Sequence, residues 1–67
     1  MANNRLALRI RAFRKLKSLT QLELAERLGV SIAILGAIER GARKPDDKLV
    51  QRIAEALDVE RDELLCE

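Results

Sequence analysis

The sequence predicts an all-α domain of five short helices, and three observations lead to this fold class. Apolar residues recur at intervals of three and four, whereas the alternation typical of strands is absent. Capping and turn residues divide the chain into short segments that each have this helical periodicity. A length of 67 residues, 48% of them apolar, suits one small domain spanning residues 1–67.

The first predicted helix takes Asn3 or Asn4 as its N-cap. Four apolar residues then fall on one face, which we expect to enter the core: Leu6, Ile10, Phe13 and Leu16.

The second helix begins at a capping box, in which Thr20 and Glu23 each satisfy a backbone amide of the other. Leu24, Ala25 and Leu28 form its apolar face. Gly29 follows directly and can adopt the left-handed conformation that ends a helix, so this helix is about two turns long.

The third helix takes Ser31 as its cap, turns Leu35 and Ile38 inward and stops at Gly41. Only the three residues GVS separate it from the second helix, so the two must cross at a steep angle. This arrangement is a helix-turn-helix.

The fourth helix follows Pro45, with Asp46 as its cap. Its expected inward residues are Leu49, Val50, Ile53, Ala54 and Leu57. Asp58 and Val59 interrupt the pattern, and a last short helix covers residues 61–65. Leu64 can fold back onto the core, or Leu65 can be left for a partner.

Composition argues against several classes of function. The chain has no histidine, no glycine-rich phosphate loop and no credible carboxylate pair, so we expect neither an enzyme nor a cofactor or metal site. Cys66 is the single cysteine, which precludes an internal disulfide and is typical of a reducing cytoplasm. No apolar run is long enough to span a membrane.

Charge is distributed unevenly although the net charge is only +2. Six basic residues precede the first acidic residue, Glu23, whereas five acidic residues and the single Arg61 occupy the stretch from Asp58 onward. One part of the surface should therefore attract phosphate and another repel it, although such charges can also serve solubility alone.

From Leu6 to about Leu65 the chain resembles the XRE family, the phage repressor and Cro class of helix-turn-helix DNA-binding domains. The strongest matches are the stretches LTQLELAERLGVS and IERGARKPD. Within them, the family's pattern is met at Gln21, Ala25, Gly29, Val30, Ser31, Ile38, Glu39, Gly41 and Pro45.

The resemblance implies a compact repressor-like domain that places its third helix in the major groove of double-stranded DNA. It also implies an ion pair between Arg14 and Glu39; the alternative is two exposed charges that never meet. The implied contacts to phosphate or an adjacent minor groove are Gln21, Ser31, Arg40, Arg43 and Lys44.

The positions from which this family reads bases fall on Ile32, Ala33, Gly36 and Ala37, which we call the reading face. None of these side chains has a hydrogen-bond donor or acceptor. Three explanations remain open: contact with thymine methyl groups plus DNA shape, docking of a protein, or burial of some apolar residues in the core. The first explanation concerns Ile32 and Ala33, and the other two concern Leu22, Ile32, Ile34 and Leu65.

We therefore expect a cytoplasmic, nucleoid-associated transcriptional regulator of bacterial or phage type, acting as a repressor and as a homodimer. Its expected dimer interface is Val59, Leu64 and Leu65, the alternative being a frayed C-terminus. A second hypothesis is a helix-turn-helix scaffold that binds another protein through its apolar third helix.

Overall fold

The computed structural model describes residues 2–65, and five helices make up its regular structure. They are α1 (Ala2–Leu16), α2 (Gln21–Leu28), α3 (Ile32–Glu39), α4 (Asp47–Leu57) and α5 (Arg61–Leu65). Within residues 2–65 no strand occurs, so the predicted all-α class is confirmed. Cys66 lies outside the described residues.

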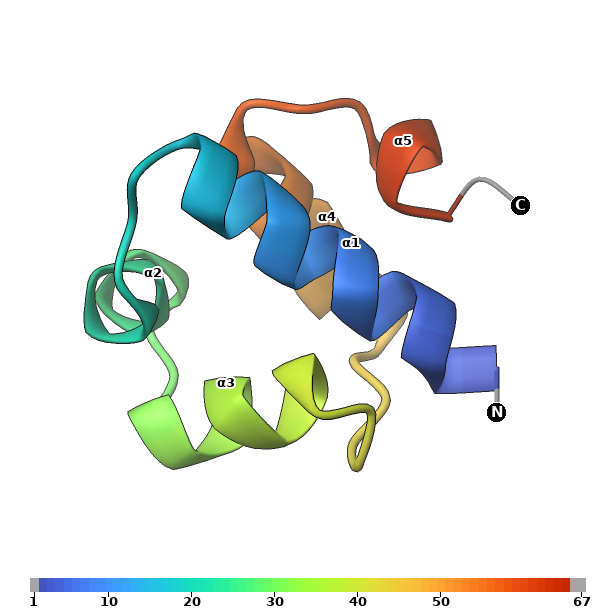
Figure 1. Ribbon diagram of the computed structural model, residues 1–67, viewed down its shortest axis with the longest axis horizontal. Coiled ribbons are helices and arrows are strands. Elements are labelled where there is room, and N and C mark those ends of the chain that lie inside the picture. Colours follow the sequence, from blue (N-terminus) through green and yellow to red (C-terminus); the bar gives the residue numbers. More distant parts are fainter. Residues whose placement is uncertain (1, 66–67) are drawn as a thin grey trace.

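The five helices surround one core (Figure 1). α1 packs across α4, and α5 folds back against both of them. α2 and α3 contact each other at the opposite side, where α2 also packs on α4 and α3 packs on α1. The helix-turn-helix is thus held on a base made by α1 and α4.

Every helix contributes to the core. Its largest fully buried side chains are Ile10, Leu24, Leu28, Leu35, Ile38, Ile53, Leu57 and Leu64. Each such side chain stabilises the fold by about 1.5–3 kcal/mol relative to an exposed one. The periodicities of α2, α3 and α4 predicted these inward residues correctly.

Two predictions for α1 were wrong. The helix begins at Ala2 and so contains both asparagines, which excludes Asn3 and Asn4 as N-caps; alanine has the highest helix propensity. Leu16 is 74% exposed, because Ser18 adopts a left-handed φ of 61° and turns the chain so that Leu19 packs on the core instead.

The caps predicted for α2, α3 and α4 are present. Thr20 and Glu23 form a complete capping box, while Ser31 and Asp46 accept hydrogen bonds from the amides of Ile34 (3.1 Å) and Leu49 (2.8 Å). Asp58 ends α4 in the left-handed conformation. These local contacts define where α2, α3 and α4 begin and where α4 ends.

Candidate nucleic-acid interface

A Schellman motif at Gly29 forms the corner between α2 and α3. Gly29 has a φ of 73° and donates its amide to the Glu26 carbonyl (3.2 Å), and the Val30 amide reaches the Ala25 carbonyl (3.1 Å). These bonds satisfy the last carbonyls of α2 while the chain reverses direction. α3 then starts three residues after Gly29, which produces the steep crossing visible in Figure 1.

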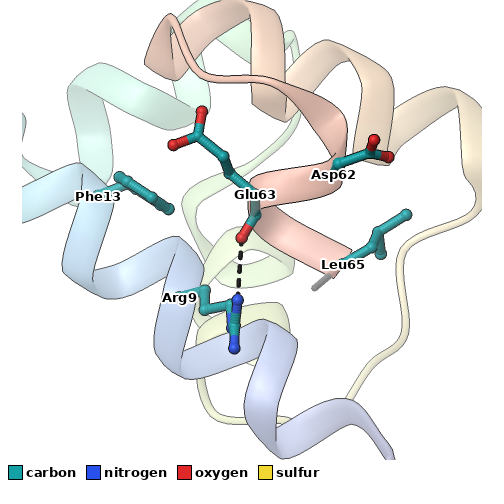
Figure 2. Close-up of a pocket in the computed structure, with 5 residues that line it drawn as sticks. All are labelled: Arg9, Phe13, Asp62, Glu63 and Leu65. Atoms are coloured by element: carbon teal, nitrogen blue, oxygen red, sulfur yellow. Dashed lines mark hydrogen bonds between the residues drawn. The ribbon is translucent and has the colours of Figure 1, made fainter. Parts of the chain in front are cut away.

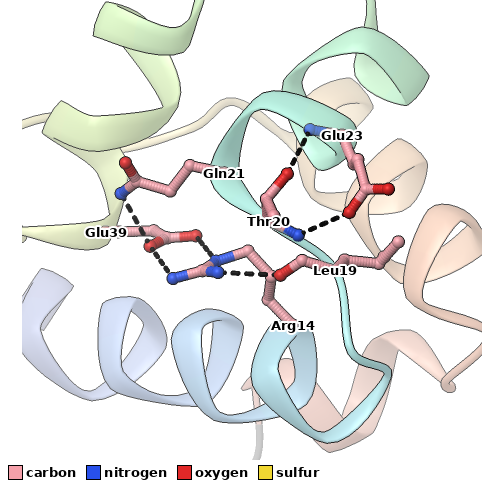
Figure 3. Close-up of polar contacts among 6 residues, drawn as sticks. All are labelled: Arg14, Leu19, Thr20, Gln21, Glu23 and Glu39. Atoms are coloured by element: carbon pink, nitrogen blue, oxygen red, sulfur yellow. Dashed lines mark hydrogen bonds and ion pairs between the residues drawn. The ribbon is translucent and has the colours of Figure 1, made fainter.

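A polar network holds α3 against the rest of the domain (Figure 3). The Arg14 guanidinium binds the Glu39 carboxylate through Nε to Oε2 (2.7 Å) and Nη2 to Oε1 (3.2 Å). Its Nη1 donates to the Leu19 carbonyl (2.8 Å). The structure therefore contains the ion pair that the family resemblance implies, with side chains only 11% and 1% exposed.

Gln21 joins this network, a contact that the sequence did not predict. Its Nε2 donates to Glu39 Oε1 at 3.1 Å, which links the first residue of α2 to the last residue of α3. One amide hydrogen is used internally, so the second amide hydrogen is left as a donor that suits a phosphate oxygen. No sequence pattern connects residues 18 apart, so only the fold could reveal it.

The reading face is confined to one side of α3. Ile32 is 47% exposed and Ala33 is also exposed, whereas Ala37 is half-buried and Gly36 is buried. Ile34 packs against the core, so of the three explanations that the sequence left open, burial in the core applies to this residue. Leu22, on α2, remains 54% exposed.

Charged groups flank the reading face at the C-terminal end of α3. Arg40, Arg43 and Lys44 are all exposed, and Gly41, with a φ of 77°, starts the loop that carries the last two. Pro45 is buried and Asp46 caps α4, so the loop is anchored at its far end. At the other end of α3, the exposed Ser31 hydroxyl caps first-turn amides that can also face an anion.

The expected dimer surface needs one correction. Leu64 is 1% exposed and belongs to the core, because α5 folds it between α1 and α4; it cannot serve as an interface residue. Val59 is half-buried against the core, and Leu65 is 43% exposed.

Leu65 borders an open groove of about 620 Å³ between α1 and α5 (Figure 2). We call this the α1–α5 groove; it is lined by Arg9, Phe13, Asp62, Glu63 and Leu65. Arg9 donates to the Glu63 backbone carbonyl (3.1 Å) and so fastens α5 to α1.

Within residues 2–65, no helix is long and apolar enough to cross a membrane. The same part of the chain holds no group of three or more His, Cys, Asp or Glu side chains that could bind a metal ion.

The sequence of the chain matches a known protein family. The model of the helix-turn-helix family HTH_3 matches residues 10–64. The chain is 54% identical over 56 residues to the uncharacterized HTH-type transcriptional regulator YazB of Bacillus subtilis, covering 84% of this chain and 81% of that protein.

Two solved structures share the whole architecture. The restriction-modification controller protein C.AhdI of Aeromonas hydrophila superposes with a TM-score of 0.89 at 34% identity, covering 92% of this chain and 94% of that one. The clp gene regulator ClgR of Corynebacterium glutamicum superposes with a TM-score of 0.93 at 31% identity, covering 97% and 69% of the two chains. With the Gly29 corner and the matched family model, these similarities show that the chain belongs to the XRE family of helix-turn-helix DNA-binding transcriptional regulators.

Proposed function

We propose that this protein is a sequence-specific repressor that binds double-stranded DNA as a homodimer, with α3 in the major groove. It acts in the cytoplasm, at the nucleoid, and needs no cofactor or small-molecule substrate. The observation that carries the proposal is an exposed, uncharged start of α3 set between polar and cationic groups that suit phosphate: Gln21, Ser31, Arg40, Arg43 and Lys44.

The buried network supports this role physically. Arg14 and Gln21 hold Glu39 from two other elements, so α3 has a fixed orientation before it meets DNA. A preorganised helix loses less conformational entropy on binding. Apolar contact of Ile32 and Ala33 with thymine methyl groups, together with DNA shape, would then contribute to sequence preference.

The protein-docking hypothesis for α3 is not favoured, since the family binds DNA and Ile34 packs within the molecule. The exposed apolar residues at the start of α3, Ile32 and Ala33, would instead contact thymine methyl groups in the major groove.

A homodimer fits the size of the domain and the α1–α5 groove. One 67-residue module makes few phosphate contacts, whereas two modules can address half-sites about 34–36 Å apart. The groove combines the apolar Phe13 and Leu65 with a cation, Arg9, and the carboxylates of α5. A surface that carries both charges can be self-complementary across a two-fold axis.

The test measures binding to fluorescent duplexes by anisotropy over a range of salt concentrations. Wild-type protein should bind random duplexes weakly, with log affinity falling linearly with log salt. Arg43→Ala/Lys44→Ala should make this dependence less steep, reducing the magnitude of the slope by about 1 for each phosphate that the variant no longer neutralises. Selection from random duplexes should then recover a two-half-site sequence, and transcription in vitro from a promoter carrying it should fall when the protein is added.

The matched control is Arg11→Ala/Lys15→Ala, which removes the same charge from exposed positions of α1, outside the helix-turn-helix. It should bind much as the wild type does. Absence of duplex binding at low salt would refute the proposed function, and equal reductions of affinity in the two double variants would refute the assigned DNA-binding surface.

A further inference from the structure

Gly36 occupies the middle of α3 without a packing reason inside the molecule. Glycine in a helix interior is destabilising relative to alanine, so a close approach by another group is the expected explanation. A Cβ built at this position would meet no atom of another helix within 4 Å among the described residues. The glycine is therefore not needed for helix packing, although the residue is buried.

The group that covers Gly36 is the side chain of Arg40. Arg40 Nη1 lies 3.2 Å from the position that a Cβ at residue 36 would occupy, closer than ordinary van der Waals contact. The Arg40 backbone is still right-handed (φ −89°, ψ −4°), so its side chain leaves the surface as a continuation of α3. Side chains on a helix lean toward its N-terminus, which brings residue 40 over residue 36, one turn earlier.

The Arg40 guanidinium is unused within the described part of the chain. No hydrogen bond or ion pair of its side chain occurs there, and the residue is exposed. Its five N–H donors therefore lie across a helix face whose own side chains have none. Ile32, Gly36 and Arg40 follow at i, i+4 and i+8, so Arg40 extends the same stripe as the reading face.

We propose that Arg40, unlike Arg43 and Lys44, does not bind phosphate but reads a guanine in the major groove, and that Gly36 is the positioning residue that lets the guanidinium lie along α3. This inference rests on the proposed function, since it requires α3 to enter that groove. A guanidinium binds guanine O6 and N7 through two parallel hydrogen bonds, and this arginine contact is the commonest specific one to a base. The reading face has no hydrogen-bonding side chain of its own, and Arg40 at the end of the helix would supply one.

The decisive variant is Arg40→Lys, which keeps the positive charge but removes the planar fork. In selections from random duplexes, wild type should prefer guanine at one position of each half-site by about 5- to 150-fold, the discrimination of one bidentate pair. Arg40→Lys should lose most of that preference while the salt dependence of binding stays unchanged. Arg43→Lys, in the adjacent loop, is the matched control and should keep the preference.

Gly36→Ala tests the positioning role separately. A methyl group there would make the guanidinium give way by a few tenths of an ångström, so the guanine preference should fall. The helix should become no less stable, with a melting temperature up to about 4–8 °C higher because alanine is the better helix former. Loss of preference together with a melting temperature at or above that of the wild type would support positioning and would exclude simple unfolding.

The outcomes separate this inference from the proposed function. If the wild type binds duplex DNA and Arg40→Lys keeps every base preference, Arg40 contacts phosphate and the guanine assignment is overturned. If Gly36→Ala keeps the full preference, the positioning role is overturned. If the wild type binds no duplex at all, the proposed function itself fails.

Discussion

At the scale of single residues, the Arg14 and Glu39 pair matters more for the orientation of α3 than for net stability. Desolvating two charges costs roughly what their attraction returns, but removing one partner leaves a buried charge without compensation. Glu39 accepts hydrogen bonds from both Arg14 and Gln21, and its side chain is only 1% exposed. The pair therefore penalises any arrangement in which α3 moves away from α1.

We expect Arg14→Ala to reduce the free energy of unfolding by about 3–5 kcal/mol, because Glu39 would be left buried and charged. Urea denaturation followed by circular dichroism measures this loss, and a largely unfolded variant would agree with it. The control Arg14→Met/Glu39→Leu removes both charges and should recover most of the stability. An Arg14→Ala variant as stable as the wild type would contradict the structural role of the pair.

Glu23 connects the α2 cap to pH. The Thr20 backbone amide donates to its carboxylate (2.8 Å), and this bond, helped by the Thr20 hydroxyl, holds the pKa of Glu23 below its usual value of 4.5. The folded-state pKa is depressed, so the stabilisation is complete above pH 4.5 and is lost as pH falls through the lower, folded-state pKa. The side chain is exposed, so we expect a small effect.

The measurement compares the melting temperatures of wild type and Glu23→Gln from pH 7 to about pH 3, the range in which carboxylates titrate. Glutamine keeps an acceptor for the Thr20 amide but does not titrate, so the advantage of the wild type should shrink below pH 4.5. A difference that stays constant across this range would show that the capping box makes no pH-dependent contribution.

At the scale of elements, two helices end at residues in the left-handed conformation, and the steric cost of that conformation differs between them. Gly29 adopts a φ of 73° without steric cost, whereas Asp58 adopts a φ of 58° with a side chain present. Both donate their amides to the preceding turn. The corner before α3 is thus relaxed, and the corner before α5 carries strain.

We expect opposite effects from exchanging these residue types. Gly29→Ala should destabilise the domain by about 1–2 kcal/mol, since alanine disfavours this backbone conformation. Its Cβ would also meet Arg52 Nη2 at 3.4 Å, which is ordinary contact and adds little. Asp58→Gly should stabilise it by up to about 1 kcal/mol. Thermal or urea unfolding measures both, and a stabilising Gly29→Ala would contradict the relaxed left-handed corner.

At the scale of the whole molecule, the surfaces proposed to face DNA and a second copy lie on different elements. α3 and the loop after it supply the proposed DNA contacts, whereas α1 and α5 form the α1–α5 groove. Figure 1 shows α5 on the far side of α1 from α3. This separation allows two copies to associate while each leaves its α3 free for DNA.

Leu65→Glu tests the partner surface. A charge at this 43% exposed position, beside Asp62 and Glu63 of the same groove, should weaken self-association by at least about tenfold. Sedimentation equilibrium without DNA measures the change. Leu22→Glu, at an exposed position on α2, is the matched control and should sediment as the wild type does. A wild type that is monomeric at all concentrations would refute the homodimer.

The sequence by itself determined the features that depend on neighbours within one helical turn. Thr20, Ser31 and Asp46 cap their helices as predicted, and Gly29 turns the chain, because these contacts join residues at most five apart. The inward faces of α2 and α4 followed from periodicity for the same reason. Family resemblance, rather than local physics, pointed to the pairing of Arg14 with Glu39.

Only the tertiary structure decided which of several chemically similar side chains are buried and which distant side chains contact each other. Leu16 was expected inside, but the left-handed Ser18 lets Leu19 fill the core. Leu64 and Leu65 are chemically alike, and the docking of α5 buries one and exposes the other. Gln21 reaches Glu39 because α2 and α3 pack together. Such choices depend on contacts between distant segments, which short-range patterns in a sequence do not encode.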